Sequence, residues 1–207
     1  MVVGKGARPC ECRLNKYREW LIGRIPSRFT GVSLETLKPD PSIHPKQAAA
    51  IQTMIAEPEA SYFLAGKAGV GKTMLLWALY RKAVEIGQRR VICCTLSNLL
   101  EEYRALFRAI DAGMKPELPR LTAEMLDQSS VKYAVFLDDL DKAVVTDWAG
   151  EQVYRLVNAI YERGHQLVVT SNKSINELTR QYSRKDETLG EPIVRRMTED
   201  AIVVEFF

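Results

Sequence analysis

Long apolar runs are absent from this sequence of 207 residues. The strand-like apolar stretches, such as 133–137 and 167–169, fall far short of the about 20 residues that a membrane-spanning helix requires. The N-terminus is polar and basic, and it lacks the apolar region of a secretory signal. Internal repeats and low-complexity tracts are missing as well. These absences favour a globular cytoplasmic protein that makes no membrane contacts.

Cysteine is also scarce, with four residues in the whole chain. Cys93 and Cys94 lie within an apolar run, where a reduced and buried thiol is the expected state. Cys10 and Cys12 lie in a charged segment and are the candidates for zinc. A complete zinc site usually takes four ligands, and only the remote His44 is left to add to this pair. Zinc binding by this chain alone is therefore the less favoured alternative.

The net charge of +3 is unevenly distributed. Residues 1–38 contain eight basic and three acidic side chains, so this segment has a charge of +5 and the remainder −2. A basic segment can contact nucleic acid or an acidic partner, or it can be a solvated tail, and both alternatives stay open. Pro39 and Pro41 disfavour a helix and suit a connector. We therefore predict a basic segment over 1–38 and a core domain over 39–207.

Apolar runs alternate with segments of helical periodicity along this core. Strands are expected at 61–65, 90–95, 133–138, 166–171 and 201–206. Helices are expected at 71–87, 97–112 and 147–163. Such alternation is typical of an α/β fold in which helices cover both faces of a parallel sheet.

A glycine-rich segment, GKAGVGKT, directly follows the first predicted strand. It matches the phosphate-binding pattern G-x-x-x-x-G-K-[ST], in which glycines let several backbone N–H groups point at one phosphate chain. Lys72 would reach the β- and γ-phosphates of ATP, and the Thr73 hydroxyl would bind Mg²⁺. The helix that follows adds its positive N-terminal end. The expected nucleotide contacts are Gly66, Lys67, Ala68, Gly69, Val70, Gly71, Lys72, Thr73 and Met74.

Two carboxylates end the third predicted strand. In P-loop ATPases the first such acid holds Mg²⁺ through water, and the second polarises the attacking water. Asp138 fits the first role and Asp139 the second, while Asp141 fits better as a capping or loop residue than as an accessory acid. An apolar strand ending in two aspartates is a weak signal alone, but it supports the glycine-rich loop.

Polar residues also follow the fourth predicted strand and precede the fifth. Asn172 either reaches the γ-phosphate region and orients water or only caps the segment 174–178. Arg195 and Arg196 either form surface ion pairs or reach the phosphate of a neighbouring subunit as arginine fingers. The sequence leaves both pairs of alternatives open.

Taken in order, these motifs make the chain resemble the DnaC/DnaI-type replicative helicase loaders and the IstB-type transposition helper ATPases, a branch of the AAA+ superfamily. The resemblance covers nearly the whole chain from about Arg8 onward, through IPSRF with LETL, GKAGVGKT, VFLDDLD, VVTSNKSINEL and LGEPIVRRM. It implies a five-stranded parallel P-loop core, ATP and Mg²⁺ as ligands, self-association into a spiral or ring, and no C-terminal helical lid domain.

The resemblance also implies roles for individual residues. Asn172 would be the sensor at the strand tip, and Arg196 the finger acting on a neighbour, with Arg195 as a second candidate. Arg28 and Phe29 would lie near the adenine. Many loaders carry an N-terminal helicase-gripping domain with a four-cysteine zinc site, of which residues 1–38 would be a remnant. Many relatives also place a glutamate where this chain has Asp139, so a slow intrinsic ATPase is expected.

Single-stranded DNA is the nucleic acid that the resemblance favours. The segment 94–108 resembles the initiator-type insertion that grips single strands in this branch. Arg104 and Arg108, one helical turn apart, would bind consecutive phosphates, and Thr95 and Ser97 would donate hydrogen bonds to the DNA backbone. In the alternative reading the apolar residues of this helix pack in the core and its arginines pair with Glu101 or Glu102.

We therefore expect an ATP-dependent loader that engages a replicative helicase hexamer and single-stranded DNA during DNA replication, and that hydrolyses ATP at subunit interfaces. A transposition helper ATPase that binds duplex DNA and recruits a transposase is the main alternative. A P-loop kinase for a small molecule would instead act as a monomer that is indifferent to DNA. A nucleotide-gated scaffold with negligible hydrolysis is the fourth hypothesis.

Overall fold

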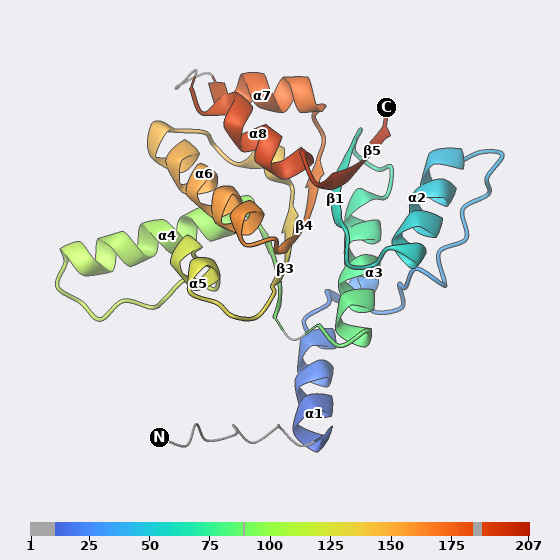
Figure 1. Cartoon of the computed structure of the whole chain (residues 1–207), viewed down its shortest axis with the longest axis horizontal. Coiled ribbons are helices and arrows are strands. Elements are labelled where there is room, and N and C mark those ends of the chain that lie inside the picture. Colours follow the sequence, from blue (N-terminus) through green and yellow to red (C-terminus); the bar gives the residue numbers. More distant parts are fainter. Residues whose placement is uncertain (1–10, 89, 184–187) are drawn as a thin grey trace.

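The computed structural model describes residues 11–88, 90–183 and 188–207. Its centre is one sheet of five parallel strands in the order β2-β3-β4-β1-β5 (Figure 1). The strands are β1 (Ser61–Gly66), β2 (Val91–Thr95), β3 (Ala134–Asp138), β4 (Gln166–Ser171) and β5 (Ala201–Phe206). This confirms the predicted five-stranded parallel sheet, and every strand lies where an apolar run predicted it.

Helices connect the strands. The three long helices predicted from periodicity are present to within two residues at each end, as α3 (Lys72–Glu85), α4 (Leu96–Asp111) and α6 (Asp147–Glu162). The remaining helices are α1 (Glu11–Ile22), α2 (Pro45–Ala56), α5 (Ala123–Asp127), α7 (Ile175–Ser183) and α8 (Gly190–Thr198). Two short 3₁₀ turns, η1 (Ser27–Phe29) and η2 (Leu140–Lys142), complete the described elements.

The sheet separates two apolar cores. Because successive side chains of a strand point to opposite faces, Phe63 and Ala65 of β1 belong to one core, and Tyr62 and Leu64 to the other. Helices α4 to α8 cover the first face, and α1, α2 and α3 lie on the second (Figure 1). Burial on both faces explains why the strands read as nearly continuous apolar runs.

Residues that precede the predicted domain boundary pack against this core. Leu21, Ile25 and Leu34 are buried in the same core as helix α3. The Tyr80 hydroxyl of α3 also donates a hydrogen bond to the carbonyl oxygen of Leu21, at 3.0 Å. The described part of the basic segment is thus attached to the core that surrounds the sheet, while the functional division at residue 38 remains a prediction.

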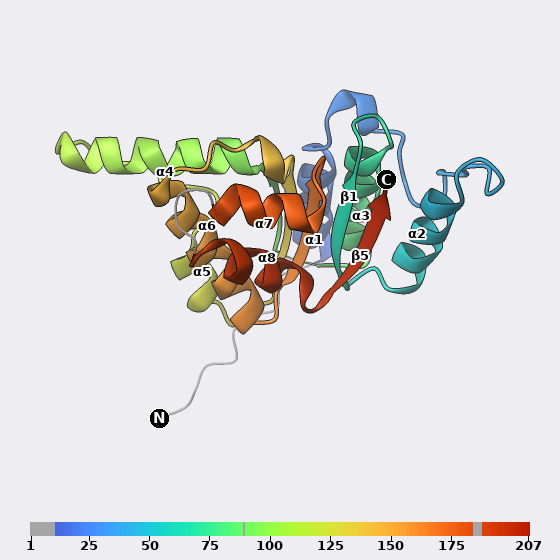
Figure 2. The ribbon, with the colours of Figure 1, turned by 90° about the horizontal axis from the view of Figure 1, so that it is seen from above.

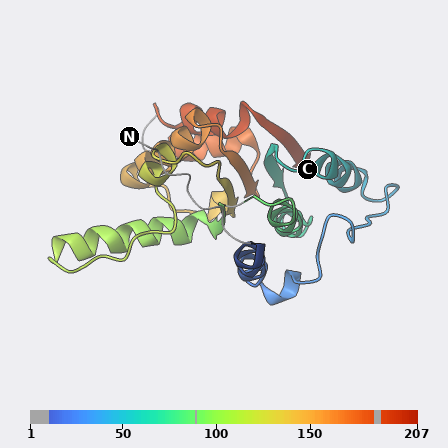
Figure 3. The ribbon, with the colours of Figure 1, turned by 60° about the horizontal axis from the view of Figure 1, so that its bottom comes forward.

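Helix α4 extends away from the rest of the molecule, as Figures 2 and 3 show from two directions. Its first half is anchored by the buried side chains of Leu99, Leu100 and Tyr103. Phe107, near its far end, is 45% exposed. The helix therefore presents a long solvent-accessible surface beyond its anchored half.

No helix among the described residues combines the length and the apolar character that crossing a membrane would demand. The described residues form no helical lid domain over the sheet.

Glycine 190, at the start of α8, provides a first testable prediction. A Cβ atom added there would lie 2.6 Å from the Thr179 carbonyl oxygen and 2.8 Å from the Ser183 backbone nitrogen. Because both atoms belong to the backbone of α7, G190A must push α7 and α8 apart, and overpacking of this kind costs about 1–3 kcal/mol of unfolding free energy. Chemical denaturation should show this loss.

The matched control is G31A, since a Cβ atom at Gly31 meets nothing within 4 Å. We expect it to change the unfolding free energy by no more than about 0.5 kcal/mol. Equal stabilities for the two variants would contradict the tight packing of α7 on α8.

Candidate nucleotide-binding site

The glycine-rich loop connects the end of β1 to the start of α3. Gly69 and Gly71 have φ angles of 86° and 94°, in the left-handed region that favours glycine. Gly66 is required for a different reason, because a Cβ atom there would lie 2.7 Å from the Cβ of Phe206 on the paired strand β5. The loop thus has the backbone form that lets N–H groups converge on phosphate at a helix N-terminus.

Lys72 is the first residue of α3 and is only 6% exposed. Its Nζ donates hydrogen bonds to the carbonyl oxygens of Gly66 and Lys67, at 2.7 and 2.9 Å, and to Oδ1 of Asn172, at 3.0 Å. Burial lowers the pKa of Lys72 below its ordinary value, and the charges of the nearby aspartates oppose this shift. The ammonium group is therefore held between the loop and the tip of β4.

Asp138, the last residue of β3, joins three elements. Its Oδ1 accepts hydrogen bonds from the Thr73 hydroxyl of α3, at 3.1 Å, and from the Thr170 hydroxyl of β4, at 2.5 Å. The carboxyl ends of parallel strands share one edge of the sheet, which is why residues so distant in sequence meet here. A hydroxyl beside a carboxylate is the oxygen donor set that Mg²⁺ prefers, so Thr73 and Asp138 fit the predicted metal role.

Asp139 is the only non-glycine residue with positive φ in the part of the chain that the structure describes, at 56°. Its backbone N–H donates to the Thr170 hydroxyl at 2.9 Å, and its Oδ2 pairs with Nζ of Lys142 at 2.6 Å. The pairing with Asp139 raises the pKa of Lys142. The carboxylate predicted to polarise water is thus next in sequence to Asp138, which is predicted to hold Mg²⁺, but it is paired with a lysine.

Asn172 follows β4 and is held by Asp141 of η2. The backbone N–H of Asn172 donates to Oδ1 of Asp141 at 2.7 Å, and its Nδ2 donates to Oδ2 at 3.2 Å. The amide is therefore oriented with its nitrogen toward Asp141 and its oxygen toward Lys72. The side chain of Asn172 contacts Lys72 and Asp141 and does not cap α7, the helix that follows. This geometry favours the alternative in which Asn172 lies at the phosphate site over the capping alternative.

A cavity of about 680 Å³ opens beside the loop. Leu37, Ile51 and Met74 contribute apolar surface to it, and the loop residues from Ala68 to Gly71 form one wall. Arg28 and Phe29 do not line this cavity. Phe29 stacks on Trp77 with ring centroids 6.5 Å apart, and the Arg28 guanidinium lies 4.6 Å from the centre of the Phe29 ring. Contact of these two residues with adenine remains a prediction.

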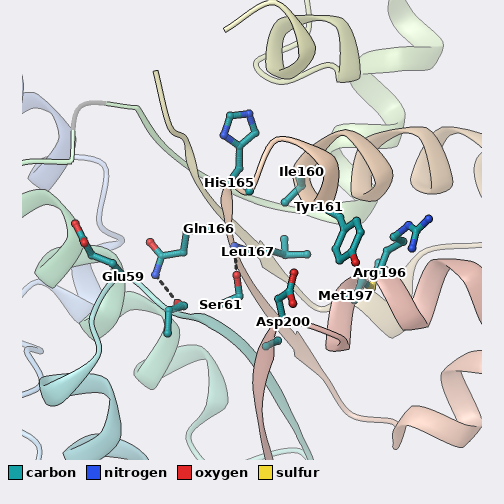
Figure 4. Close-up of a pocket in the computed structure, with 13 residues that line it drawn as sticks. Glu59, Ser61, Ile160, Tyr161, His165, Gln166, Leu167, Arg196, Met197 and Asp200 are labelled. Carbon is teal, nitrogen blue, oxygen red and sulfur yellow. Dashed lines mark hydrogen bonds between the residues drawn. The ribbon is translucent and has the colours of Figure 1, made fainter. Parts of the chain in front are cut away.

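Arg196 lies near the amino ends of the strands, whereas the loop follows the carboxyl end of β1. It lines a second cavity, of about 250 Å³, with Ser61 and Gln166, which begin β1 and β4 (Figure 4). Its Nε donates to Oδ1 of Asn158 at 3.0 Å, and its guanidinium lies 4.5 Å from the centre of the Tyr161 ring. Arg195 is more exposed and pairs with Glu199 at 3.2 Å.

The residues predicted to bind DNA lie together on α4 and at its N-terminus. The Thr95 hydroxyl caps α4 by accepting a hydrogen bond from the backbone N–H of Asn98 at 3.2 Å, and Ser97 is exposed in the first turn. Arg104 and Arg108 both pair with Glu101, at 3.3 and 2.7 Å. The packed apolar face and the arginine–glutamate face therefore coexist on one helix.

The predicted cysteine pair is only partly described, because Cys10 lies outside the described residues. Cys93 and Cys94 are free thiols whose pKa values are raised by burial, that of Cys94 to about 12. Within the ranges 11–88, 90–183 and 188–207, no cluster of three or more histidine, cysteine, aspartate or glutamate residues could hold a metal ion.

The sequence did not point to Thr170 or Lys142, and it favoured a capping or loop role for Asp141 over that of an accessory acid. Thr170 lies inside an apolar strand, and its hydrogen bonds to Asp138 and Asp139 depend on the β3–β4 pairing, which no local pattern reveals. The spacing of Asp141 behind the two strand-end aspartates was a usable signal, because η2 turns its carboxylate back toward the tip of β4.

Comparison with known proteins identifies related sequences. A family model described as IstB-like ATP binding protein matches residues 40–206. The chromosomal replication initiator protein DnaA of Mesoplasma florum is 30% identical over 156 residues, which make up 72% of this chain and 33% of that protein. The chain thus spans about a third of the length of this curated relative.

Solved structures share the fold. DnaI superposes with a TM-score of 0.67 at 15% identity, over 88% of this chain and 94% of that one. The DnaC helicase loader gives 0.64 at 22% identity, over 86% and 98%. The replication initiator DnaA bound to AMPPCP and single-stranded DNA gives 0.59 at 19% identity, over 88% and 50%.

The P-loop geometry, the parallel five-stranded sheet and these structural likenesses establish an AAA+ fold of the P-loop type. The family match covers the sheet from β1 to β5 and every described residue of the loop site. The chain belongs to the family of IstB-like ATP binding proteins.

Proposed function

We propose that this protein is an ATP-dependent loader of the replicative DNA helicase. The observation that most supports this proposal is the complete set of Lys72, Thr73, Asp138 and Asn172 contacts at one edge of the sheet. The second support is the coverage of the structural match, which includes almost the whole of the DnaC and DnaI chains.

The nucleotide would bind with its phosphates against the loop. Lys72 would exchange its hydrogen bonds to the loop carbonyls for bonds to the β- and γ-phosphates. Thr73 and Asp138 would hold Mg²⁺, which neutralises charge that develops on the phosphates. The purine would lie in the cavity beside Leu37, Ile51 and Met74, where apolar surface suits a flat ring.

Asp139 would polarise the attacking water, and Asn172 would orient it. A carboxylate oxygen that already accepts a hydrogen bond from an ammonium group is less available to a water molecule. The 2.6 Å contact between Lys142 and Asp139 therefore predicts slow turnover in the isolated chain. Assembly or DNA binding that separates the pair would accelerate hydrolysis.

Asp141 serves this scheme as a positioning residue for Asn172. Replacement by alanine removes both acceptors of Asn172, so the amide is no longer held toward Lys72. We expect D141A to lower kcat about 10- to 100-fold, as loss of such supporting contacts does elsewhere, with little change in ATP affinity. Steady-state kinetics combined with equilibrium binding of a fluorescent ATP analogue would separate the two effects.

D111A is the matched control, since Asp111 is exposed at the end of α4. It should retain the kcat of the wild type. A D141A enzyme with unchanged kcat would remove Asn172 positioning from the mechanism.

Assembly would complete the site. Arg196 would act on the nucleotide of a neighbouring subunit, because it lies far from the loop of its own chain. The projecting α4 helices would line a groove for single-stranded DNA, with Arg104 and Arg108 on phosphates and Thr95 and Ser97 on the backbone. ATP would stabilise this assembly on the helicase, and hydrolysis would release it.

A transposition helper that binds duplex DNA and recruits a transposase is the second candidate. The specific observation in its favour is the match to the IstB-like family model over 40–206. Competition between single-stranded and duplex oligonucleotides in the presence of ATP discriminates the two candidates. A preference for duplex DNA would favour the helper.

The primary test is native mass spectrometry of the full chain mixed with the replicative helicase of its host, first with ATP and then with ADP. The loader proposal predicts an ATP-favoured complex with several copies of this chain on each helicase hexamer. A chain that binds ATP but forms no complex with the helicase would contradict the proposal and favour the transposition helper.

A further inference from the structure

A surface of exposed aromatic rings and arginines lies on the outer side of α1, away from the nucleotide site. Tyr17 and Trp20 stack on one another with ring centroids 5.7 Å apart and planes inclined by 17°. Trp20 is 55% exposed and Tyr17 37%. The guanidinium of Arg24 lies 4.9 Å from the centre of the Trp20 ring, so an arginine extends the stack.

The periodicity of α1 gathers further positive charge on the same side. Residues 13, 16, 17 and 20 of α1 are three or four positions apart and share one face, and Arg24 follows two residues after the helix ends. Leu21 of α1 and Ile25, which follows the helix, are buried against the core. Arg13, Lys16 and Arg24 are exposed, and none of the ion pairs found among the described residues involves them.

The aromatic surface borders a cavity of about 200 Å³ between α1 and the edge strand β2. Six of its lining residues are aromatic or basic, namely Tyr17, Trp20, Arg24, Arg90, Arg120 and Tyr133. Arg24 and Arg120 also line a neighbouring cavity, of about 330 Å³, that includes Glu102 and Ala105 of α4. The two cavities form a continuous surface from α1 to α4.

We propose that this α1–β2 surface binds the unpaired bases of single-stranded DNA. Stacked aromatic rings flanked by arginines suit this ligand, because every base has an aromatic face and every nucleotide adds a negative phosphate. The aromatic side chains would stack on bases, and Arg13, Lys16 and Arg24 would contact phosphates. The inference rests on the proposed function for its DNA partner, but it places a contact outside α4.

Photocrosslinking of the full chain to a single-stranded oligonucleotide containing 5-iododeoxyuridine tests this surface directly. Irradiation links the modified base to an aromatic ring stacked on it, and mass spectrometry of the digested protein identifies the residue. We expect crosslinks at Tyr17 or Trp20. Crosslinks confined to the α4 segment would overturn the inference and leave the proposed loader function intact.

Affinity measurements provide the second test, by fluorescence anisotropy with a labelled oligothymidine. W20A should weaken binding about 5- to 150-fold, the range for losing one base–aromatic stack, whereas W20F should retain most of the affinity. R24Q should reduce the slope of log affinity against log salt by about 0.7, the value for one phosphate contact on a single strand. Thermal unfolding should be unchanged in all three variants because both side chains are exposed.

R180Q is the matched control, since Arg180 is exposed on α7, at the opposite end of the molecule from α1 (Figure 1). Its salt slope should equal that of the wild type. Wild-type affinity in W20A would overturn the inference. Loss of helicase binding in W20A with intact DNA binding would also overturn it and reassign the surface to the helicase. A wild-type chain that binds no single-stranded DNA would overturn this inference and the DNA contacts of α4 together. Helicase binding, which native mass spectrometry measures, tests the loader function separately.

Discussion

K72A is expected to abolish ATP binding. In the folded chain, Lys72 Nζ is buried and makes three hydrogen bonds, to two loop carbonyls and to Asn172. Hydrogen bonds to charged groups are worth about 1.5–3 kcal/mol each, so loss of contacts to two phosphates should cost about 3–6 kcal/mol. Isothermal titration with ATP and Mg²⁺ should therefore show affinity weakened at least about 150-fold.

The control for this variant must separate lost binding from lost folding. Removing Lys72 leaves the carbonyl oxygens of Gly66 and Lys67 without their ammonium partner, so the far-ultraviolet circular dichroism and the Tm of K72A should be measured alongside. K115A is the matched lysine variant, since Lys115 is exposed after α4, and it should bind ATP normally. A folded K72A chain with wild-type affinity would disprove the phosphate role of the loop.

R196A is expected to bind ATP normally and to lose turnover. Ser61, at the start of β1, lines the cavity that Arg196 also lines. Gly66, at the other end of β1, is the first residue of the phosphate loop. At about 3.3 Å per residue, these two ends of the strand are about 16 Å apart. The side chain therefore cannot serve the nucleotide of its own chain, and an arginine finger supplied by a neighbour is worth about 10³- to 10⁵-fold in kcat.

Mixing two inactive variants tests whether the arginine acts between subunits. K72A retains Arg196 but should bind no nucleotide, and R196A binds nucleotide but lacks the arginine. A mixture should recover turnover that neither variant shows alone. R155A replaces another exposed arginine, which pairs with Glu124, and should retain full activity. Full turnover in R196A would exclude the finger role, and R195A would then test the adjacent arginine.

The sheet could be predicted from the sequence because parallel strands buried on both faces are almost uniformly apolar. Each of the five apolar runs became a strand, and each strongly periodic segment a helix. Helices α1, α2, α5, α7 and α8 were not anticipated. Nearly the whole of α1 is exposed, with Leu21 its one buried residue, and α7 and α8 are short segments whose helical form depends on packing against one another.

The site was predictable only where its signal is local. The loop motif and the pair of strand-end aspartates are each a contiguous stretch of sequence. The structure brings the two stretches together through the hydrogen bond between Thr73 and Asp138. Contacts made by Thr170 and Asp141 join residues about thirty positions apart, so they depend on sheet register. The surroundings of Arg28 and Phe29 depend on how the segment before α2 packs, which the sequence does not reveal.

The pairing of Gly66 with Phe206 has a practical consequence. It places the last strand directly beside the phosphate loop, and the carbonyl oxygen of Phe207 accepts a hydrogen bond from Lys46 of α2 at 2.9 Å. A fluorophore attached after Phe207 would therefore lie close to bound nucleotide and report its arrival as a change in emission. An affinity tag at the same position would crowd the site, so purification handles belong elsewhere on this chain.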